Sequence, residues 1–193
     1  MAIRAKICGL KTEEAIRAAQ DNGAEFLGFI FHPKSPRYLT PEQAGKISKV
    51  ATAKKVAVVV DADDEPLSNI ILQLKPDYIQ LHGEESELRA REIKDRFGLP
   101  LIRAIKPNQY VFQNLYDYIL VDSPNGGGSG KTFDWRNFTP PAQDWFLSGG
   151  LNAQNVKEAI ATTGAKMVDV SSGVESAPGV KDLAKIKAFL KAF

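Results

Sequence analysis

Short runs of apolar and β-branched residues recur along the chain at nearly regular intervals. The runs are continuous rather than alternating, which is typical of parallel strands buried on both faces. Eight segments have this pattern: Ala5–Cys8, Phe26–Phe31, Val56–Val60, Tyr78–Leu81, Leu101–Ile105, Tyr118–Val121, Trp145–Leu147 and Met167–Val170. We therefore predict eight strands that belong to one parallel sheet.

Helical patterns fill most of the intervals between these runs. Thr40-Pro41-Glu42-Gln43 is a capping box with proline at the first helical position. Thr12 and Asn152 are candidate N-caps for helices over Glu13–Gln20 and Ala153–Ala161. Apolar residues at helical spacing predict three further helices, around Leu67–Leu74, over Glu85–Arg96 and around Leu183–Leu190.

The repeated order of strand and helix predicts an α/β protein with a parallel sheet. Eight units fit a closed (β/α)8 TIM barrel better than the alternative, an open doubly wound sheet. The 193 residues are few for a barrel, which typically takes about 250. Two shortened connections explain the difference: Lys106–Asp117 is too short for a full fifth helix, and Pro140-Pro141 ends the sixth soon after Phe133. We expect one barrel domain over 1–193.

Composition excludes several classes of protein. A net charge of +2 gives no electrostatic case for a nucleic-acid partner. No apolar run reaches the roughly 18 residues that span a membrane, and the N-terminus lacks a signal-peptide pattern. The single cysteine excludes an internal disulfide and suits a reducing compartment. We therefore expect a cytoplasmic protein with no membrane partner.

The segment Asn125–Trp135 resembles a phosphate-binding P-loop because Gly130-Lys131-Thr132 match the end of that motif. Asn125 stands where the first glycine belongs, and Pro140-Pro141 stops the long helix that should follow. A nucleotide site is therefore disfavoured.

Residues that can carry chemistry follow the predicted strands. In a TIM barrel the active site lies at the carboxyl ends of the strands. Those ends carry Cys8, the His32–Arg37 segment, Asp61, His82, Lys106, Asp122, Ser148-Gly149-Gly150 and Asp169–Gly173. Each has a purely structural alternative: a buried apolar cysteine, hydrogen-bonded histidines, or aspartates that cap turns. Their common position indicates an active site, and no Cys or His spacing indicates a metal.

Small residues end the seventh and eighth strands, in Ser148–Asn152 and Ser171–Gly173. Glycines let backbone N–H groups approach an anion, and the loops after these two strands often bind phosphate in TIM barrels. The alternative is that the glycines serve only tight turns.

Together these segments resemble the phosphoribosylanthranilate isomerase family of tryptophan biosynthesis over nearly the whole chain. The resemblance rests on Lys6–Leu10, Gly28–Phe31, Pro33–Tyr38, Gln80–Glu84, Leu120–Asp122, Gly127–Trp135, Leu147–Leu151 and Asp169–Glu175. It implies a (β/α)8 barrel that uses no cofactor. The implied reaction is the Amadori rearrangement of N-(5-phosphoribosyl)anthranilate to 1-(2-carboxyphenylamino)-1-deoxyribulose 5-phosphate.

The resemblance also implies roles for two residues: Cys8 as the general base and Asp122 as the general acid. A thiol must be partly ionised to act as a base, so we expect a polar or electropositive site around Cys8. A carboxyl must hold its proton to act as an acid, so we expect burial or a nearby negative charge to raise the pKa of Asp122.

Further roles follow from the same resemblance. Arg37 is expected to bind the anthranilate carboxylate, and His82 and Asp169 to line the substrate site. The ribose phosphate is expected at Gly149, Gly150, Ser171, Ser172 and Gly173. The glycine-rich segment, Gly126, Gly127, Gly128, Ser129, Gly130 and Lys131, is expected to be a lid, with Lys131 facing either substrate or solvent.

Two alternatives to this function stay open at the level of sequence. One is a related phosphate-binding barrel such as indole-glycerol-phosphate synthase, whose catalytic lysine-and-glutamate set we do not find here. The other is a non-catalytic protein that binds a phosphorylated ligand. The protein is expected to be a monomer or a homodimer.

Overall fold

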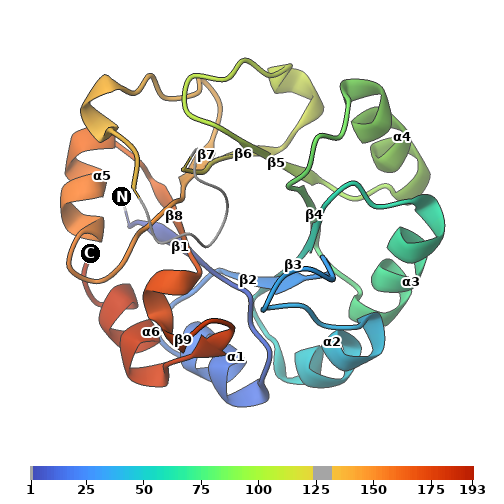
Figure 1. The fold of residues 1–193 in the computed structure, drawn as a ribbon, viewed down its shortest axis with the longest axis horizontal. Helices are drawn as coiled ribbons and strands as arrows, with labels where there is room; N and C mark the ends of the chain where they lie inside the picture. Colours follow the sequence, from blue (N-terminus) through green and yellow to red (C-terminus); the bar gives the residue numbers. More distant parts are fainter. Residues whose placement is uncertain (1, 124–131) are drawn as a thin grey trace.

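The computed structural model describes residues 2–123 and 132–193. Each strand of its closed barrel pairs in parallel with the next along the chain, and β8 returns to β1 (Figure 1). The strands are β1 (Arg4–Cys8), β2 (Phe26–Ile30), β3 (Lys54–Val59), β4 (Tyr78–Leu81), β5 (Leu101–Ile105), β6 (Tyr118–Val121), β7 (Trp145–Leu147) and β8 (Met167–Val170). This closed barrel confirms the predicted fold class over the open sheet.

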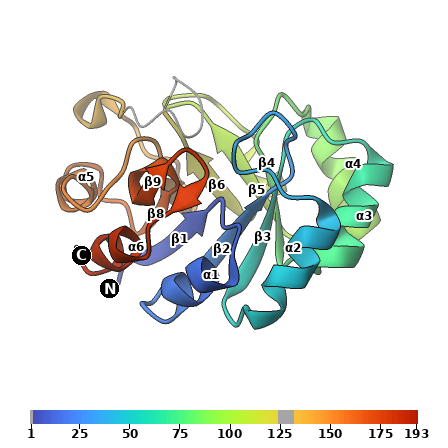
Figure 2. The same ribbon diagram turned by 60° about the horizontal axis from the view of Figure 1, so that its bottom comes forward.

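The helices wrap the outside of the barrel (Figure 2). They are α1 (Glu13–Gln20), α2 (Pro41–Ile47), α3 (Asp64–Leu74), α4 (Glu87–Phe97), α5 (Val156–Thr163) and α6 (Leu183–Leu190). Two start signals act as predicted: the Thr12 side chain accepts a hydrogen bond from the Ala15 N–H, and Thr40 and Gln43 form a complete capping box. The last helix, α6, packs beside α1 and so completes the ring around the barrel (Figure 1).

Two predicted helix starts were too early. Helix α5 begins at Val156, because Asn152 caps a turn instead: its Oδ1 accepts hydrogen bonds from the N–H groups of Gln154 and Asn155. Helix α4 begins after Ser86, whose side chain caps it. Glu85, which was predicted as the start of this helix, lies outside it. Its Oε2 forms an ion pair with Nη1 of Arg103 at 2.6 Å.

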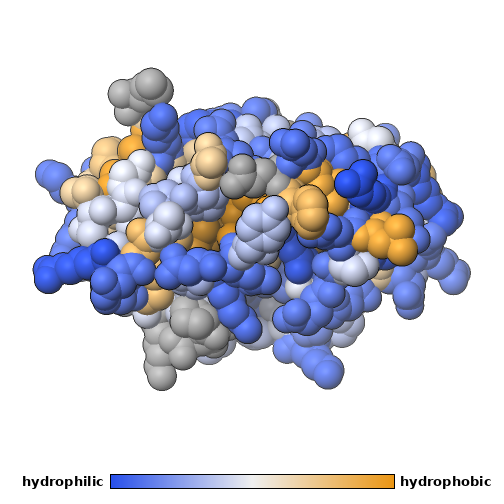
Figure 3. Space-filling model, turned by 90° about the horizontal axis from the view of Figure 1, so that it is seen from above, coloured by the Kyte–Doolittle hydropathy of each residue, from blue (hydrophilic) through white to orange (hydrophobic). Residues whose placement is uncertain are grey.

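The helical layer is thin beside β6, as predicted. Only the 3-10 turns η2 (Gln113–Leu115) and η3 (Trp135–Asn137) occur in the described parts of the connections on either side of that strand. The face that carries these connections is mostly hydrophilic, with apolar residues reaching the surface near its middle (Figure 3). Tyr110 and Phe112 are exposed in the first connection. In the described part of the chain, no helix is long and apolar enough to cross a membrane.

Alternation along the strands separates two apolar clusters. Side chains that point outward from the barrel form one cluster with the helices. Inward-pointing side chains form a second cluster, in which the rings of Phe26, Tyr118 and Phe146 contact one another edge to face. Cys8 belongs to this inner cluster. Because side chains alternate, Lys6 also points into the barrel, two residues before Cys8.

Candidate active site

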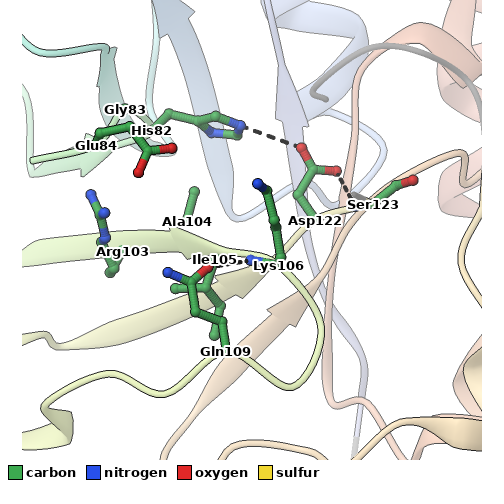
Figure 4. A pocket seen from close by; sticks show the side chains of 10 residues that line it. All are labelled: His82, Gly83, Glu84, Arg103, Ala104, Ile105, Lys106, Gln109, Asp122 and Ser123. Atoms are coloured by element: carbon green, nitrogen blue, oxygen red, sulfur yellow. Dashed lines mark hydrogen bonds and ion pairs between the residues drawn. The ribbon is translucent and has the colours of Figure 1, made fainter. Parts of the chain in front are cut away.

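Two adjoining pockets open at the carboxyl ends of the strands, each of about 220 Å³. The first, which we call the Cys8 pocket, is lined by Cys8, Ile30, His32, Ser35, Arg37, Val58, Val60, Gln80, His82, Asp122, Ser148, Asp169 and Ser171. The second, the Lys106 pocket, is lined by His82, Gly83, Glu84, Arg103, Ala104, Ile105, Lys106, Gln109, Asp122 and Ser123 (Figure 4). They share His82 and Asp122, so one ligand can occupy both.

Cys8 ends β1 with only 5 % of its surface exposed. Gly28 of β2 makes room for the thiol, because a Cβ at Gly28 would stand 2.8 Å from the sulfur atom. Burial raises the pKa of the Cys8 thiol above its usual value, while the charges of Lys6 and Lys181 oppose that shift. The expected electropositive surroundings are therefore present, but burial and the charge of Asp169 together outweigh them.

Asp122 follows β6 and is buried. Its Oδ1 accepts a 2.9 Å hydrogen bond from the Ser123 N–H, and its Oδ2 lies 3.3 Å from His82 Nε2 (Figure 4). On the other side of the imidazole ring, His82 Nδ1 lies 2.8 Å from Gln80 Nε2. With the Gln80 amide donating to Nδ1, the neutral imidazole carries its proton on Nε2 and donates it to Asp122. The histidine thus fixes the orientation of the carboxyl group.

Asp169 is the centre of a buried polar network below the Cys8 pocket. Its Oδ1 lies 2.8 Å from the ammonium of Lys6, and its Oδ2 accepts a 3.0 Å hydrogen bond from the Ser148 hydroxyl. The network therefore ties the ends of β1, β7 and β8 together. Burial lowers the pKa of Lys6, but the charges of Asp169 and Cys8 and the hydrogen bonds to both residues together outweigh burial and leave that pKa above its usual value, so Lys6 stays protonated.

Arg37 reaches the Cys8 pocket from the loop after β2, and Glu175 holds it there. The guanidinium donates from Nε and Nη2 to the two carboxylate oxygens, at 2.7 and 2.8 Å. Lys181 donates to the same carboxylate at 2.7 Å. Burial raises the pKa of Glu175, but the hydrogen bonds from Arg37 and Lys181 outweigh it and hold that pKa below its usual value. Among the described residues, Nη1 of Arg37 has no hydrogen-bond partner.

The loops after β7 and β8 lie against each other at the same rim. Gly149 and Gly150 have φ angles of +90° and +67°, a backbone conformation that favours glycine. A Cβ at Gly149 would stand 2.6 Å from the Ser123 backbone nitrogen, and a Cβ at Gly173 would collide with the Leu151 carbonyl. Within the described chain, the N–H groups of Gly149, Gly150, Ser172 and Gly173 donate to no acceptor, which suits an anion site.

Comparison with known proteins identifies relatives of the whole chain. The model of N-(5'-phosphoribosyl)anthranilate (PRA) isomerases matches residues 5–192. The isomerase of Brucella canis is 45 % identical, and the match covers 100 % of this chain and 94 % of that protein. The chain belongs to the phosphoribosylanthranilate isomerase family.

Solved structures of family members agree with this result. TrpF from Jonesia denitrificans is 38 % identical, with a TM-score of 0.87 over 99 % of this chain and 96 % of that one. A second structure, 33 % identical with a TM-score of 0.81 over 98 % and 97 % of the chains, is a PRA isomerase bound to reduced 1-(o-carboxyphenylamino)-1-deoxyribulose 5-phosphate.

The structure brings together most residues predicted from the sequence. Cys8, Arg37, His82, Asp122, Asp169 and Ser171 line the two pockets, with His32 and Lys106. Asp61 lines neither; its Oδ1 accepts a hydrogen bond from the Glu84 N–H and holds the loop after β4. The predicted lid, Gly126–Lys131, lies outside the described residues. In the described part of the chain, no group of His, Cys, Asp and Glu could hold a metal ion.

Sequence reasoning missed three charged residues of this site: Lys6, Glu175 and Lys181. Lys6 had a detectable signal, because its separation of two residues from Cys8 places both side chains on one face of a strand. Glu175 and Lys181 lie in a hairpin formed by β9 (Glu175–Ala177) and β10 (Val180–Lys181) after β8. Two and three residues are too few to give a readable strand pattern.

Proposed function

We infer that the chain is an isomerase that converts N-(5-phosphoribosyl)anthranilate to 1-(2-carboxyphenylamino)-1-deoxyribulose 5-phosphate, a step of tryptophan biosynthesis. One observation supports this best: a buried thiol, Cys8, and a buried carboxyl, Asp122, line the same pocket from β1 and β6. The Amadori rearrangement needs two such proton-transfer groups on opposite sides of one sugar.

The reaction moves protons in a defined order. An acid first protonates the ring oxygen of the ribose, so that the C1′–O bond breaks and a protonated Schiff base forms. A base then removes the proton from C2′, and the electron pair of that C–H bond forms an enolamine. The enolamine gains a proton at C1′ as it tautomerises to the ketone. The proton lost at C2′ is balanced by the proton gained at C1′, so no external oxidant or reductant is consumed.

We propose Asp122 as the acid and Cys8 as the base of these steps. Asp122 gives its proton to the ring oxygen, and His82, 3.3 Å away, is the neighbour through which it can regain one. Cys8 as thiolate takes the C2′ proton from the side of β1. Cys8 requires positive charge nearby for this, and Lys6 and Lys181 supply it. The expected protonation of Asp122 stays a prediction.

The two ends of the substrate have candidate sites on opposite sides of Cys8. We propose that the phosphate binds the free N–H groups of Gly149, Gly150, Ser172 and Gly173. For the carboxylate of anthranilate we propose Arg37. Glu175 takes the Nε–H and one Nη2–H of Arg37, so both hydrogens on Nη1 and the second on Nη2 are available for the carboxylate, and Glu175 serves to aim them.

The test of this function is direct. Phosphoribosylanthranilate is fluorescent, and its consumption by the purified protein is followed as loss of that fluorescence, with the product identified by mass and chromatography. Steady turnover to the ketose supports the proposal. Saturable binding without product would identify a non-catalytic binding protein, and would contradict it.

A further inference from the structure

Lys6 is a buried charge in the barrel interior that apolar packing does not explain. Its side chain has 0 % exposed surface and is among the largest fully buried side chains of the described residues. It lies on β1 among inward-pointing apolar residues, with Cys8 as the next inward-pointing residue toward the pocket. An ammonium group costs several kcal/mol to remove from water, and an apolar side chain of similar volume would fill the space at lower cost.

The position of this charge is fixed by two neighbouring strands. Oδ1 of Asp169, on β8, forms an ion pair with Lys6 Nζ at 2.8 Å. The hydroxyl of Ser148, after β7, donates a 3.0 Å hydrogen bond to Oδ2 of Asp169. A fully buried ion pair with a fixed partner has little freedom to move. The ammonium of Lys6 therefore keeps a fixed positive charge next to the following inward-pointing residue of β1.

That following residue is Cys8, at the pocket end of β1. The charged groups that act on this thiol are Lys6 from β1, Asp169 from β8 and Lys181 from β10. His82 and Asp122 line the same pocket from β4 and β6. Of the positive charges, Lys6 opposes the effect of burial most strongly, and the carboxylate of Asp169 acts in the reverse sense.

We propose that Lys6, held in place by Asp169, is a positioning residue that stabilises the thiolate of Cys8. The ammonium keeps its proton throughout. The thiol loses its proton to water before the substrate binds, and the thiolate then accepts the proton from C2′ of the substrate. The catalytic consequence rests on the proposed role of Cys8 as the base, whereas the effect on the thiol itself does not.

The proposal predicts effects of opposite sign from two single variants. Cys8 is the only cysteine, so the rate of alkylation by iodoacetamide against pH reports its ionisation alone. Lys6→Met removes the positive charge and should raise the pH midpoint of alkylation by about one unit or more. Asp169→Asn removes the negative charge but keeps a side-chain oxygen that accepts the hydrogen bond from Lys6, so it should lower the midpoint.

A matched control removes a lysine that is far from the site. Lys157 is exposed on α5, so Lys157→Met should leave the midpoint unchanged. Because Lys6→Met leaves Asp169 without its partner and can fail to fold, the double variant Lys6→Met/Asp169→Asn removes both charges together. Its midpoint should also rise, since the effect of Lys6 on the thiol is larger than that of Asp169.

The outcomes separate this proposal from the function itself. Midpoints that shift in the same direction in both single variants, or a Lys6→Met midpoint equal to that of the wild type, would overturn the role of Lys6. If the midpoints shift as expected but a Cys8→Ala protein turns over substrate normally, then Lys6 tunes the thiol and Cys8 is not the base. If Lys6 tunes the thiol and Cys8 is the base, the pH profile of kcat in Lys6→Met should shift in the same direction as the midpoint of alkylation.

Discussion

Asp122 is the residue whose removal should separate folding from chemistry most clearly. Asp122→Asn keeps the shape of the side chain and its hydrogen bond from the Ser123 N–H. It removes the transferable proton, so kcat should fall by roughly 10²-fold or more. Stopped or continuous fluorescence assays at saturating phosphoribosylanthranilate give this number.

Asp61 provides the control for that variant. It is also an aspartate at the rim, it lines neither pocket, and its φ of +47° is one that asparagine adopts readily. Asp61→Asn should leave kcat near the wild-type value. A folded Asp122→Asn protein with wild-type kcat would remove Asp122 from the role of acid.

A second prediction at this scale concerns the phosphate. Gly150→Leu places a side chain at the rim where backbone N–H groups are free, so it should raise KM and weaken competitive inhibition by inorganic phosphate. Gly164→Leu is the matched control, because Gly164 has a similar φ of +70° at the end of α5, with no atom near its Cβ position. Both variants suffer the same backbone strain. Equal KM values for Gly150→Leu and Gly164→Leu would show that the phosphate does not bind beside Gly150.

At the scale of elements, strands were the most predictable feature. Five of the eight have the residue bounds expected from the sequence, since each run is followed directly by a polar residue and preceded by a polar residue or a proline. Strand β3 starts two residues before the expected Val56, at Lys54, because polar residues at the amino ends are paired. Lys54 binds Glu25 at 3.1 Å and lies over the ring of Phe26. Hydropathy alone contains no information about such pairing.

The Glu25 cluster gives a prediction of pH dependence. Arg4 of β1 donates two hydrogen bonds to Glu25, which lowers the pKa of Glu25 from 4.5 to about 2. The stabilisation is therefore complete above pH 4.5 and is lost as the pH falls toward 2. Because the pair is about one-third exposed, its contribution should be no more than roughly 1 kcal/mol.

Urea unfolding of Glu25→Gln tests the direction of this pH dependence of stability. The variant should be less stable than the wild type at pH 7, and the difference should shrink progressively below pH 4.5. Glu158→Gln, on the exposed face of α5, is the control and should show no such trend. A difference between Glu25→Gln and the wild type that is constant over the whole pH range would show that the pair does not act through its charge.

At the scale of the whole molecule, barrel closure assembles the site from residues distant in sequence. The carboxyl ends of β1, β4, β6 and β8 lie where the sequence predicts them, and this was sufficient to predict that Cys8, His82, Asp122 and Asp169 would meet. The contact between Arg37 and Glu175 was not, because the residues are 138 positions apart and the hairpin that carries Glu175 gives no pattern. Long-range ion pairs of this kind depend on the final packing.

The central claim is that Cys8 acts as a base inside the substrate pocket, and one combined measurement on Cys8→Ala and the wild type tests it most directly. Iodoacetamide should alkylate the wild-type thiol with parallel loss of turnover, and reduced product analogue should protect it. Cys8→Ala should fold and bind the same analogue, with kcat lowered about 10²- to 10⁴-fold. A folded Cys8→Ala protein that turns over phosphoribosylanthranilate at the wild-type rate would contradict the account.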